Sequence, residues 1–169
     1  MAVERWFERV GTDLASAQRE AIATMLSSHA LAGRVGIVVV AHWHEAAAAL
    51  HADDRDSGWW DFEEEERERL WEVASMAHTE DQLLVAVEQA IAAREHAIDL
   101  AVKAVVARHA IADPEWGRAA RAAALMAVHQ QTLARLASAP PTQLFALKYQ
   151  LFADGRWPLG VQSGRFLIY

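Results

Sequence analysis

The chain of 169 residues contains no cysteine. Disulfide bonds, thiolate metal sites and cysteine nucleophiles all need that residue, so these three chemistries are excluded. Proline and glycine are scarce, at 4 and 8 residues, and hydrophobic residues make up 53% of the chain. This composition is typical of folded globular proteins and not of disordered ones. We therefore predict one packed domain over residues 1–169.

Long apolar segments are also missing. The longest strongly apolar run covers residues 35–41, whereas a helix that crosses a membrane needs ~20 residues. Near the N-terminus, charged residues at Glu4, Arg5, Glu8 and Arg9 interrupt the stretch that would be apolar in a secretory signal. We predict a cytoplasmic protein without a membrane span.

Positive charge is in deficit, because the formal net charge is −7. A surface of this sign repels a phosphate backbone, so nucleic-acid binding is disfavoured. Arg118, Arg121 and Arg135 share one segment, but their spacing favours a solvated helix face. The charge suits a basic protein partner instead.

The spacing of apolar residues predicts a mainly α fold, a single-domain bundle of about five to six helices that ends in a short β-hairpin. Capping signals mark two helices clearly: Thr79 and Gln82 form a capping box, and Asp113 precedes Pro114. The predicted helices cover residues 3–10, 14–31, 35–51, a stretch that follows Asp61, 80–110 and 114–137.

Two of these segments are less clear. Residues 37–40 are β-branched and favour a buried strand, whereas residues 45–50 favour a helix. Because no Gly, Pro or Asn separates the two stretches, one helix over 35–51 is the simpler prediction. At the C-terminus, turn pairs at 154–155 and 163–164 separate short apolar runs at 151–152, 157–161 and 165–169. We predict a hairpin over 148–169 that packs on the helices, since an isolated hairpin is marginally stable.

Motifs for catalysis are absent from the sequence. It has no Gly-x-Ser-x-Gly elbow, no Glu-x-x-His di-iron signature and no phosphate-binding glycine loop. The stretch from His42 to Glu45 lacks the His-Glu-x-x-His form of a zinc helix, because Ala48 stands where the second histidine belongs. On a helix, His42 and His44 would point ~200° apart. No cofactor and no catalytic residue is predicted.

Histidines from different helices offer the alternative site. His44, His96 and His129 would form a metal or catalytic centre if their helices brought them together, with Asp99 one turn from His96 to orient its imidazole. The more common role of such histidines is structural, as hydrogen-bonded packing residues. The structural role is favoured.

An acidic, tryptophan-rich stretch carries the main binding prediction. Residues 51–61 combine clustered aspartates, a Ser-Gly pair and two adjacent tryptophans, which predicts a loop. Exposed aromatic residues ringed by charge are typical of interfaces; alternatively, one tryptophan folds inward as a lid. The candidate partner-binding residues are Asp53, Asp54, Asp56, Trp59, Trp60, Asp61, Glu63 and Glu64.

The closing residues 154–161 and 164–169 resemble the C-terminal hairpins of small bacterial immunity proteins that act against secreted toxins. The resemblance covers little of the chain and carries over no residue. It supports the leading hypothesis, an immunity or antitoxin-like protein that captures a basic partner through the acidic loop. Two alternatives remain: a small helical enzyme or metal-binding protein, and a homo-oligomer that buries its tryptophan-rich surface against itself.

Overall fold

The computed structural model describes residues 4–28, 34–52 and 57–169. Within these ranges the chain forms six helices and three strands, which confirms the mainly α fold with a C-terminal hairpin. The helices are α1 (Ser16–Ser28), α2 (Trp43–His51), α3 (Ser57–Ser75), α4 (Glu80–Arg108), α5 (Pro114–Leu136) and α6 (Leu144–Ala153). The strands are β1 (Gly36–Val39), β2 (Pro158–Gln162) and β3 (Arg165–Ile168).

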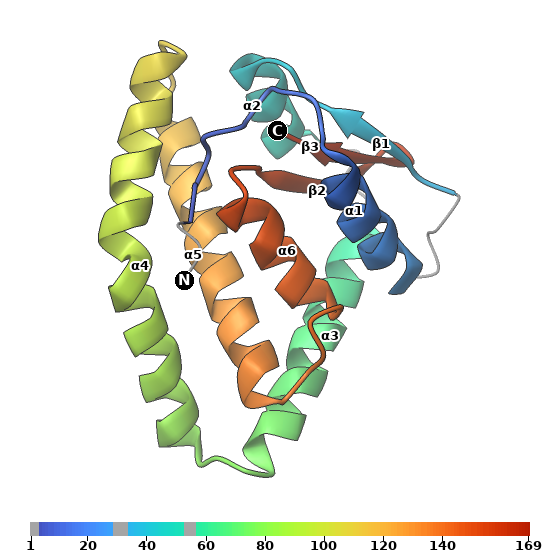
Figure 1. Ribbon diagram of the computed structural model, residues 1–169, viewed down its shortest axis with the longest axis vertical. Coiled ribbons are helices and arrows are strands. Elements are labelled where there is room, and N and C mark those ends of the chain that lie inside the picture. Colours follow the sequence, from blue (N-terminus) through green and yellow to red (C-terminus); the bar gives the residue numbers. More distant parts are fainter. Residues whose placement is uncertain (1–3, 29–33, 53–56) are drawn as a thin grey trace.

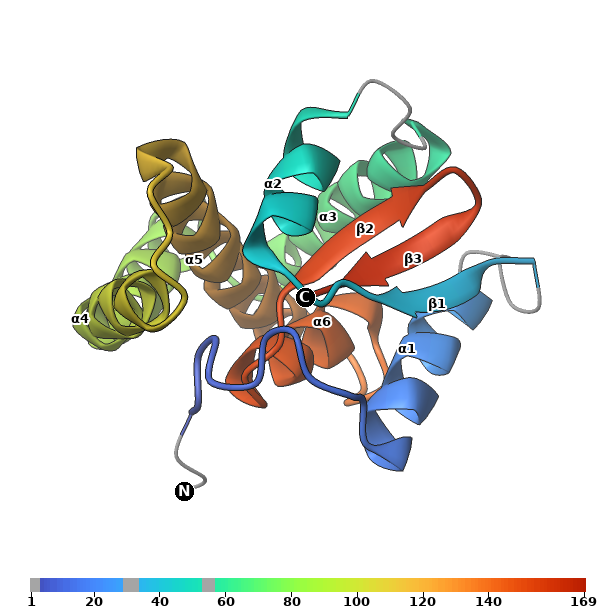
Figure 2. The same cartoon turned by 90° about the horizontal axis from the view of Figure 1, so that it is seen from above.

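Helix α5 is the central element of the helical part. It packs most extensively against α4, then against α6, and more lightly against α3 (Figure 1). The sheet lies at one end of these helices, with α1 and α2 beside it (Figures 1 and 2). This arrangement leaves one side of α5 facing α2, α3 and β2.

The two predicted long helices are confirmed, and their start signals act locally. Thr79 Oγ1 accepts a hydrogen bond from Gln82 N at 3.3 Å, and Gln82 Oε1 accepts one from Thr79 N at 2.9 Å. Asp113 accepts a hydrogen bond from Glu115 N at 2.9 Å, with Pro114 in the first helical position. These bonds satisfy N–H groups that a helix start leaves unpaired.

The predicted helix over residues 35–51 is wrong in its first half. Strand β1 pairs in parallel with β3, where Ile37 lies opposite Phe166, and α2 begins only at Trp43. Glu45 accepts hydrogen bonds from the main-chain N–H groups just before α2. The β-branched run therefore follows its local preference, but its partner strand lies at the other end of the chain, where spacing alone cannot reveal it.

The N-terminal helix predicted over residues 3–10 is also wrong, since the described residues of that segment form turns. Their apolar side chains are buried as the spacing implied, but the main chain combines a turn hydrogen bond, from Glu8 N to Arg5 O at 2.8 Å, with bonds to distant segments. Arg5 N donates to Ala153 O at 2.7 Å, and Arg9 N donates to Gly155 O at 3.0 Å. Tertiary hydrogen bonds replace those of a short, marginal helix.

Helix α1 starts later than predicted. The main-chain oxygen of Asp13, expected at the helix start, instead accepts a hydrogen bond from the buried guanidinium of Arg156. The predicted end near residue 31 lies outside the described residues.

The C-terminal sheet has order β1-β3-β2, so β1 adds a third strand to the predicted hairpin (Figure 2). The turn at Ser163 and Gly164 is confirmed by φ values of 48° and 69°. The predicted start at residue 148 and the apolar strand at 151–152 are wrong, because α6 continues to Ala153. The buried hairpin residues pack on the helices as predicted. The single domain over residues 1–169 stays a prediction.

Candidate functional site

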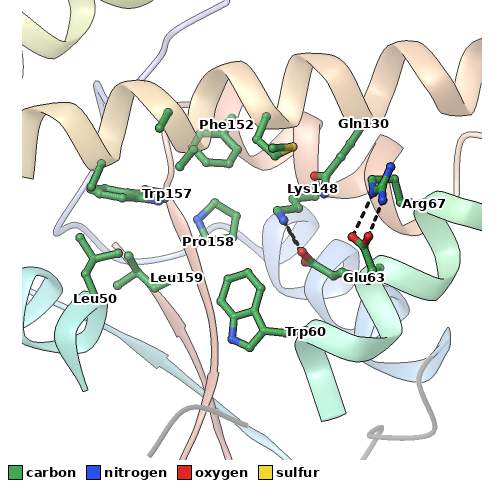
Figure 3. A pocket seen from close by; sticks show the side chains of 15 residues that line it. Leu50, Trp60, Glu63, Arg67, Gln130, Lys148, Phe152, Trp157, Pro158 and Leu159 are labelled. Carbon is green, nitrogen blue, oxygen red and sulfur yellow. Dashed lines mark hydrogen bonds and ion pairs between the residues drawn. The ribbon is translucent and has the colours of Figure 1, made fainter. Parts of the chain in front are cut away.

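A cavity of about 410 Å³ lies on the side of α5 that faces α3 and β2 (Figure 3). Its volume falls within the range of small-ligand pockets, ~300–1,000 Å³. Its apolar lining residues are Leu50, Trp60, Ala119, Ala122, Ala123, Met126, Phe152, Trp157, Pro158 and Leu159. Its polar lining residues are Glu63, Glu64, Arg67, Gln130 and Lys148.

One face of α5 forms the longest wall of this cavity. Ala119, Ala123, Met126 and Gln130 follow each other at spacings of three or four residues, and Ala122 lies three residues after Ala119, so all five share one side of the helix. The three alanines have small side chains and leave space above the helix. The wall is therefore apolar over most of its length and ends in an amide.

The opposite wall comes from α3 and β2, which approach closely at a glycine. Gly160 has φ +101°, and a Cβ built there would lie 3.5 Å from Trp60 Cζ2 and 3.6 Å from Trp59 Cδ1. Trp59 is 1% exposed and packs edge-on against Phe166, whereas Trp60 is 40% exposed and lines the cavity. The two adjacent tryptophans thus have different roles: Trp59 belongs to the core, and Trp60 forms the rim of the cavity.

An ion pair closes the polar part of the cavity. Lys148 Nζ donates to both carboxylate oxygens of Glu63, at 2.9 and 2.8 Å, and both side chains are largely buried (Figure 3). Desolvation offsets much of the attraction in a buried pair, so such a pair is weak evidence for a purely stabilising role. It places two charged groups beside the apolar walls.

Gln130 adds a buried acceptor without a partner. Its side chain is 5% exposed, and no described residue donates a hydrogen bond to Oε1. An unsatisfied buried polar group costs about 1–3 kcal/mol. In Figure 3, Gln130, Lys148, Glu63 and Arg67 gather at one side of the cavity, away from Leu50. The polar groups are therefore concentrated at one end.

Exposed carboxylates are frequent along α3, and one of them, Glu64, lines the cavity. Glu64 pairs with Arg67, whose hydrogen bond holds the pKa of the Glu64 carboxyl below its ordinary value. Asp61, Glu65 and Glu68 are exposed, and no described residue forms an ion pair with them. The outer surface of α3 therefore carries uncompensated negative charge beside Trp60.

Two further hollows adjoin the cavity. One of about 380 Å³ lies between α2 and α5 and shares Leu50, Ala119 and Ala122 with it. Another, of about 330 Å³, follows α3 past Trp71 and shares Arg67. We refer to the cavity and these two hollows together as the α5 groove.

The predicted partner-binding residues are only partly brought together. Trp60, Asp61 and Glu64 lie on α3 with exposed side chains, but Trp59 and Glu63 are buried. Asp53, Asp54 and Asp56 lie outside the described residues. The predicted loop over residues 51–61 is wrong at both ends, because α2 includes residue 51 and α3 begins at residue 57; Asp61 is therefore inside α3 and does not cap it.

The three histidines of the alternative site belong to three different helices. His44, His96 and His129 lie on α2, α4 and α5, and no group of three or more His, Asp or Glu in the described ranges has the geometry to hold a metal. Burial lowers the pKa of His129, so the neutral imidazole is favoured, as expected for a packing residue. The rings of His42 and His44 stack with centroids 5.4 Å apart, because His42 precedes α2 and does not belong to it.

Comparison with known proteins gives no assignment: no family model, curated protein or solved structure matches the chain. In the part of the chain that the structure describes, no helix has the length and apolar character needed to cross a membrane.

Proposed function

We propose that the protein binds a partner protein and holds a basic segment of that partner in the α5 groove. The observation that carries this proposal is the open cavity of about 410 Å³ beside the exposed edge of Trp60. Tryptophan is enriched among the residues that dominate binding energy at interfaces, and such residues cluster around pockets that a partner side chain fills.

Charge supports a basic partner. The chain carries a net charge of −7, and Asp61, Glu65 and Glu68 lie exposed on the same helix as Trp60. Complementary charge accelerates association and selects among partners more than it adds affinity. An immunity or antitoxin-like role is one setting in which the capture of a basic protein would be useful.

The shape of the groove supports an extended segment. The cavity has one neighbouring hollow along α2 and another along α3, each of which shares lining residues with it. A small molecule would fill one of these hollows, whereas a peptide would place successive side chains in neighbouring ones. This continuity makes a protein segment the better occupant.

The experiment compares the tagged protein with three variants in extracts of its source cells. We expect one basic protein to co-purify with the wild type and to fall at least about tenfold with Trp60→Ala, which removes the anchor, and with Ala123→Phe, which fills the cavity. Met76→Ala is the matched control, since Met76 is 80% exposed and does not line the groove.

Circular dichroism checks that each variant folds. Equal recovery of the partner with all three variants would contradict the proposal. Size-exclusion chromatography of the same proteins tests the competing idea, because self-association through Trp60 predicts a dimer that Trp60→Ala dissociates.

A further inference from the structure

The polar end of the cavity offers an acceptor without a partner and an ammonium with a spare donor. Gln130 Oε1 is a buried acceptor to which no described residue donates. Lys148 carries an ammonium with three donors, and its hydrogen bonds to described residues go only to the two oxygens of Glu63. Both side chains line the same end of the cavity, together with Glu63, Glu64 and Arg67, and the rest of the lining is apolar.

We infer that this cavity binds a tyrosine side chain of the partner, with the phenol hydroxyl at the polar end. This inference rests on the proposed function and names the group that the cavity recognises. A hydroxyl both donates and accepts, so it can donate to Gln130 and accept from Lys148. The phenol ring then lies against Met126 and Phe152, which line the cavity one helical turn from Gln130 and from Lys148.

Other side chains fit these groups less well. A carboxylate would face Glu63 and would leave the acceptor of Gln130 unpaired. A lysine or arginine would satisfy Gln130 but would bring a second positive charge beside Lys148 and lose its hydration. A phenylalanine or leucine would fill the apolar space and seal the acceptor of Gln130 away from water without a donor, which costs free energy.

The tyrosine belongs to a basic chain segment because of what flanks the cavity. Trp60 and Glu64 line the cavity, and carboxylates also line the two other hollows of the α5 groove: Glu68 and Glu72 along α3, and Asp113 and Glu115 beside α2. Basic residues on either side of the tyrosine would therefore meet negative charge while the ring is buried.

The test uses two acetylated and amidated heptapeptides of alternating lysine and glycine that differ only at the centre, one with tyrosine and one with phenylalanine. Nuclear magnetic resonance titration of the full-length, ¹⁵N-labelled protein gives both affinities and shows whether the Gln130 side-chain amide shifts. We expect the tyrosine peptide to bind roughly 3- to 10-fold more tightly, the range that one net hydrogen bond provides.

Two variants locate the origin of this preference. Gln130→Met keeps the size of the side chain but removes the acceptor, so the preference for tyrosine should disappear while the phenylalanine peptide still binds. Ala123→Phe fills the cavity and should weaken both peptides, whereas Met76→Ala should change neither.

The outcomes separate the two proposals. Equal affinities of the two peptides for the wild type, or a tyrosine preference that survives Gln130→Met, would overturn the tyrosine assignment and leave the proposed function standing. Absence of binding by both peptides would overturn the capture of a basic segment as well. If free p-cresol bound as tightly as the tyrosine peptide, the occupant would be a small phenol and not a protein segment.

Discussion

The two faces of α5 are both rich in alanine, but the alanines have different roles on each face. Ala120, Ala124 and Ala127 are fully buried, and Ala124 shares a helix face with Gly117, where a built Cβ would lie 3.7 Å from Val102 Cγ1 of α4. On the other face, alanines 119, 122 and 123 line an open groove. A stripe of alanine therefore shows that a neighbour can approach closely, but only the neighbour decides whether the stripe becomes packed core or binding surface.

The largest expected effect concerns the ion pair on the open face. Lys148→Met leaves the carboxylate of Glu63 buried without its partner, so we expect the free energy of unfolding at pH 7 to fall by about 3 kcal/mol. Urea denaturation measures this change. The double variant Lys148→Met, Glu63→Leu should recover most of the loss, and a single variant as stable as the wild type would show that water already solvates this end of the groove.

A matched pair of substitutions tests the difference between the two faces directly. Ala124→Leu inserts a larger side chain into the α4 contact and should lower the free energy of unfolding by about 2 kcal/mol, because overpacking strains a tight core. In Ala122→Leu the larger side chain projects into the groove, so the free energy of unfolding should change by less than about 0.5 kcal/mol. Equal losses in urea denaturation would mean that the groove is as tightly packed as the α4 contact.

Gln130→Met sharpens the contrast, because it removes a polar atom that the fold leaves unpaired. We expect the unliganded variant to be as stable as the wild type or more stable by up to about 1 kcal/mol. A clear rise in melting temperature in differential scanning calorimetry would indicate that Gln130 is kept at a cost to stability. A loss above about 1 kcal/mol would instead indicate that Gln130 has a structural partner.

Another prediction concerns alkaline pH and the tyrosine next to Lys148 on α6. The hydroxyl of Tyr149 donates to Glu4 and accepts from Arg94 Nε at 2.8 Å; burial, with the Glu4 hydrogen bond, raises its pKa to about 12. Since the folded pKa lies above the unfolded value near 10, this contribution to stability is complete below pH 10 and is lost as pH rises toward 12.

Burial also raises the pKa of Tyr169, the other tyrosine of the chain. Phenolate absorbance of the folded protein at pH 10 should therefore stay well below the value that two unperturbed tyrosines give. Half-ionisation of both residues at pH 10 would show that the hydroxyl of Tyr149 is exposed to water.

Local signals explain which parts of the fold the sequence predicted. Helices α4 and α5 begin at capping residues that act within one turn of the chain. Thr79 and Asp113 were therefore sufficient to predict where these helices start. Strand β1 and the N-terminal turns depend on partners near the C-terminus, such as β3 and Arg156, and no spacing within the segment reports them. The start of α3 was missed because the Ser-Gly pair at 57–58 favours a turn in isolation.

The candidate site shows the same limit. Trp60 and Glu64, which line the cavity, were among the predicted residues because aromatic and acidic residues cluster in the sequence itself. Gln130 and Lys148 were not, since each is an ordinary helical residue until α5 and α6 bring it to the cavity. The helical spacing of Ala119, Ala123, Met126 and Gln130 indicates that these residues share one face of α5. It does not indicate that this face is open to solvent.

The central claim, that the open face of α5 holds a basic segment, is tested most directly by mapping where the tyrosine heptapeptide binds on the ¹⁵N-labelled wild-type protein. We predict chemical-shift changes concentrated along residues 119–130 of α5 and at the indole N–H of Trp60, with the exposed surface of α4 around Leu100 unaffected. Changes centred on α4, or spread evenly over the acidic surface, would contradict the account.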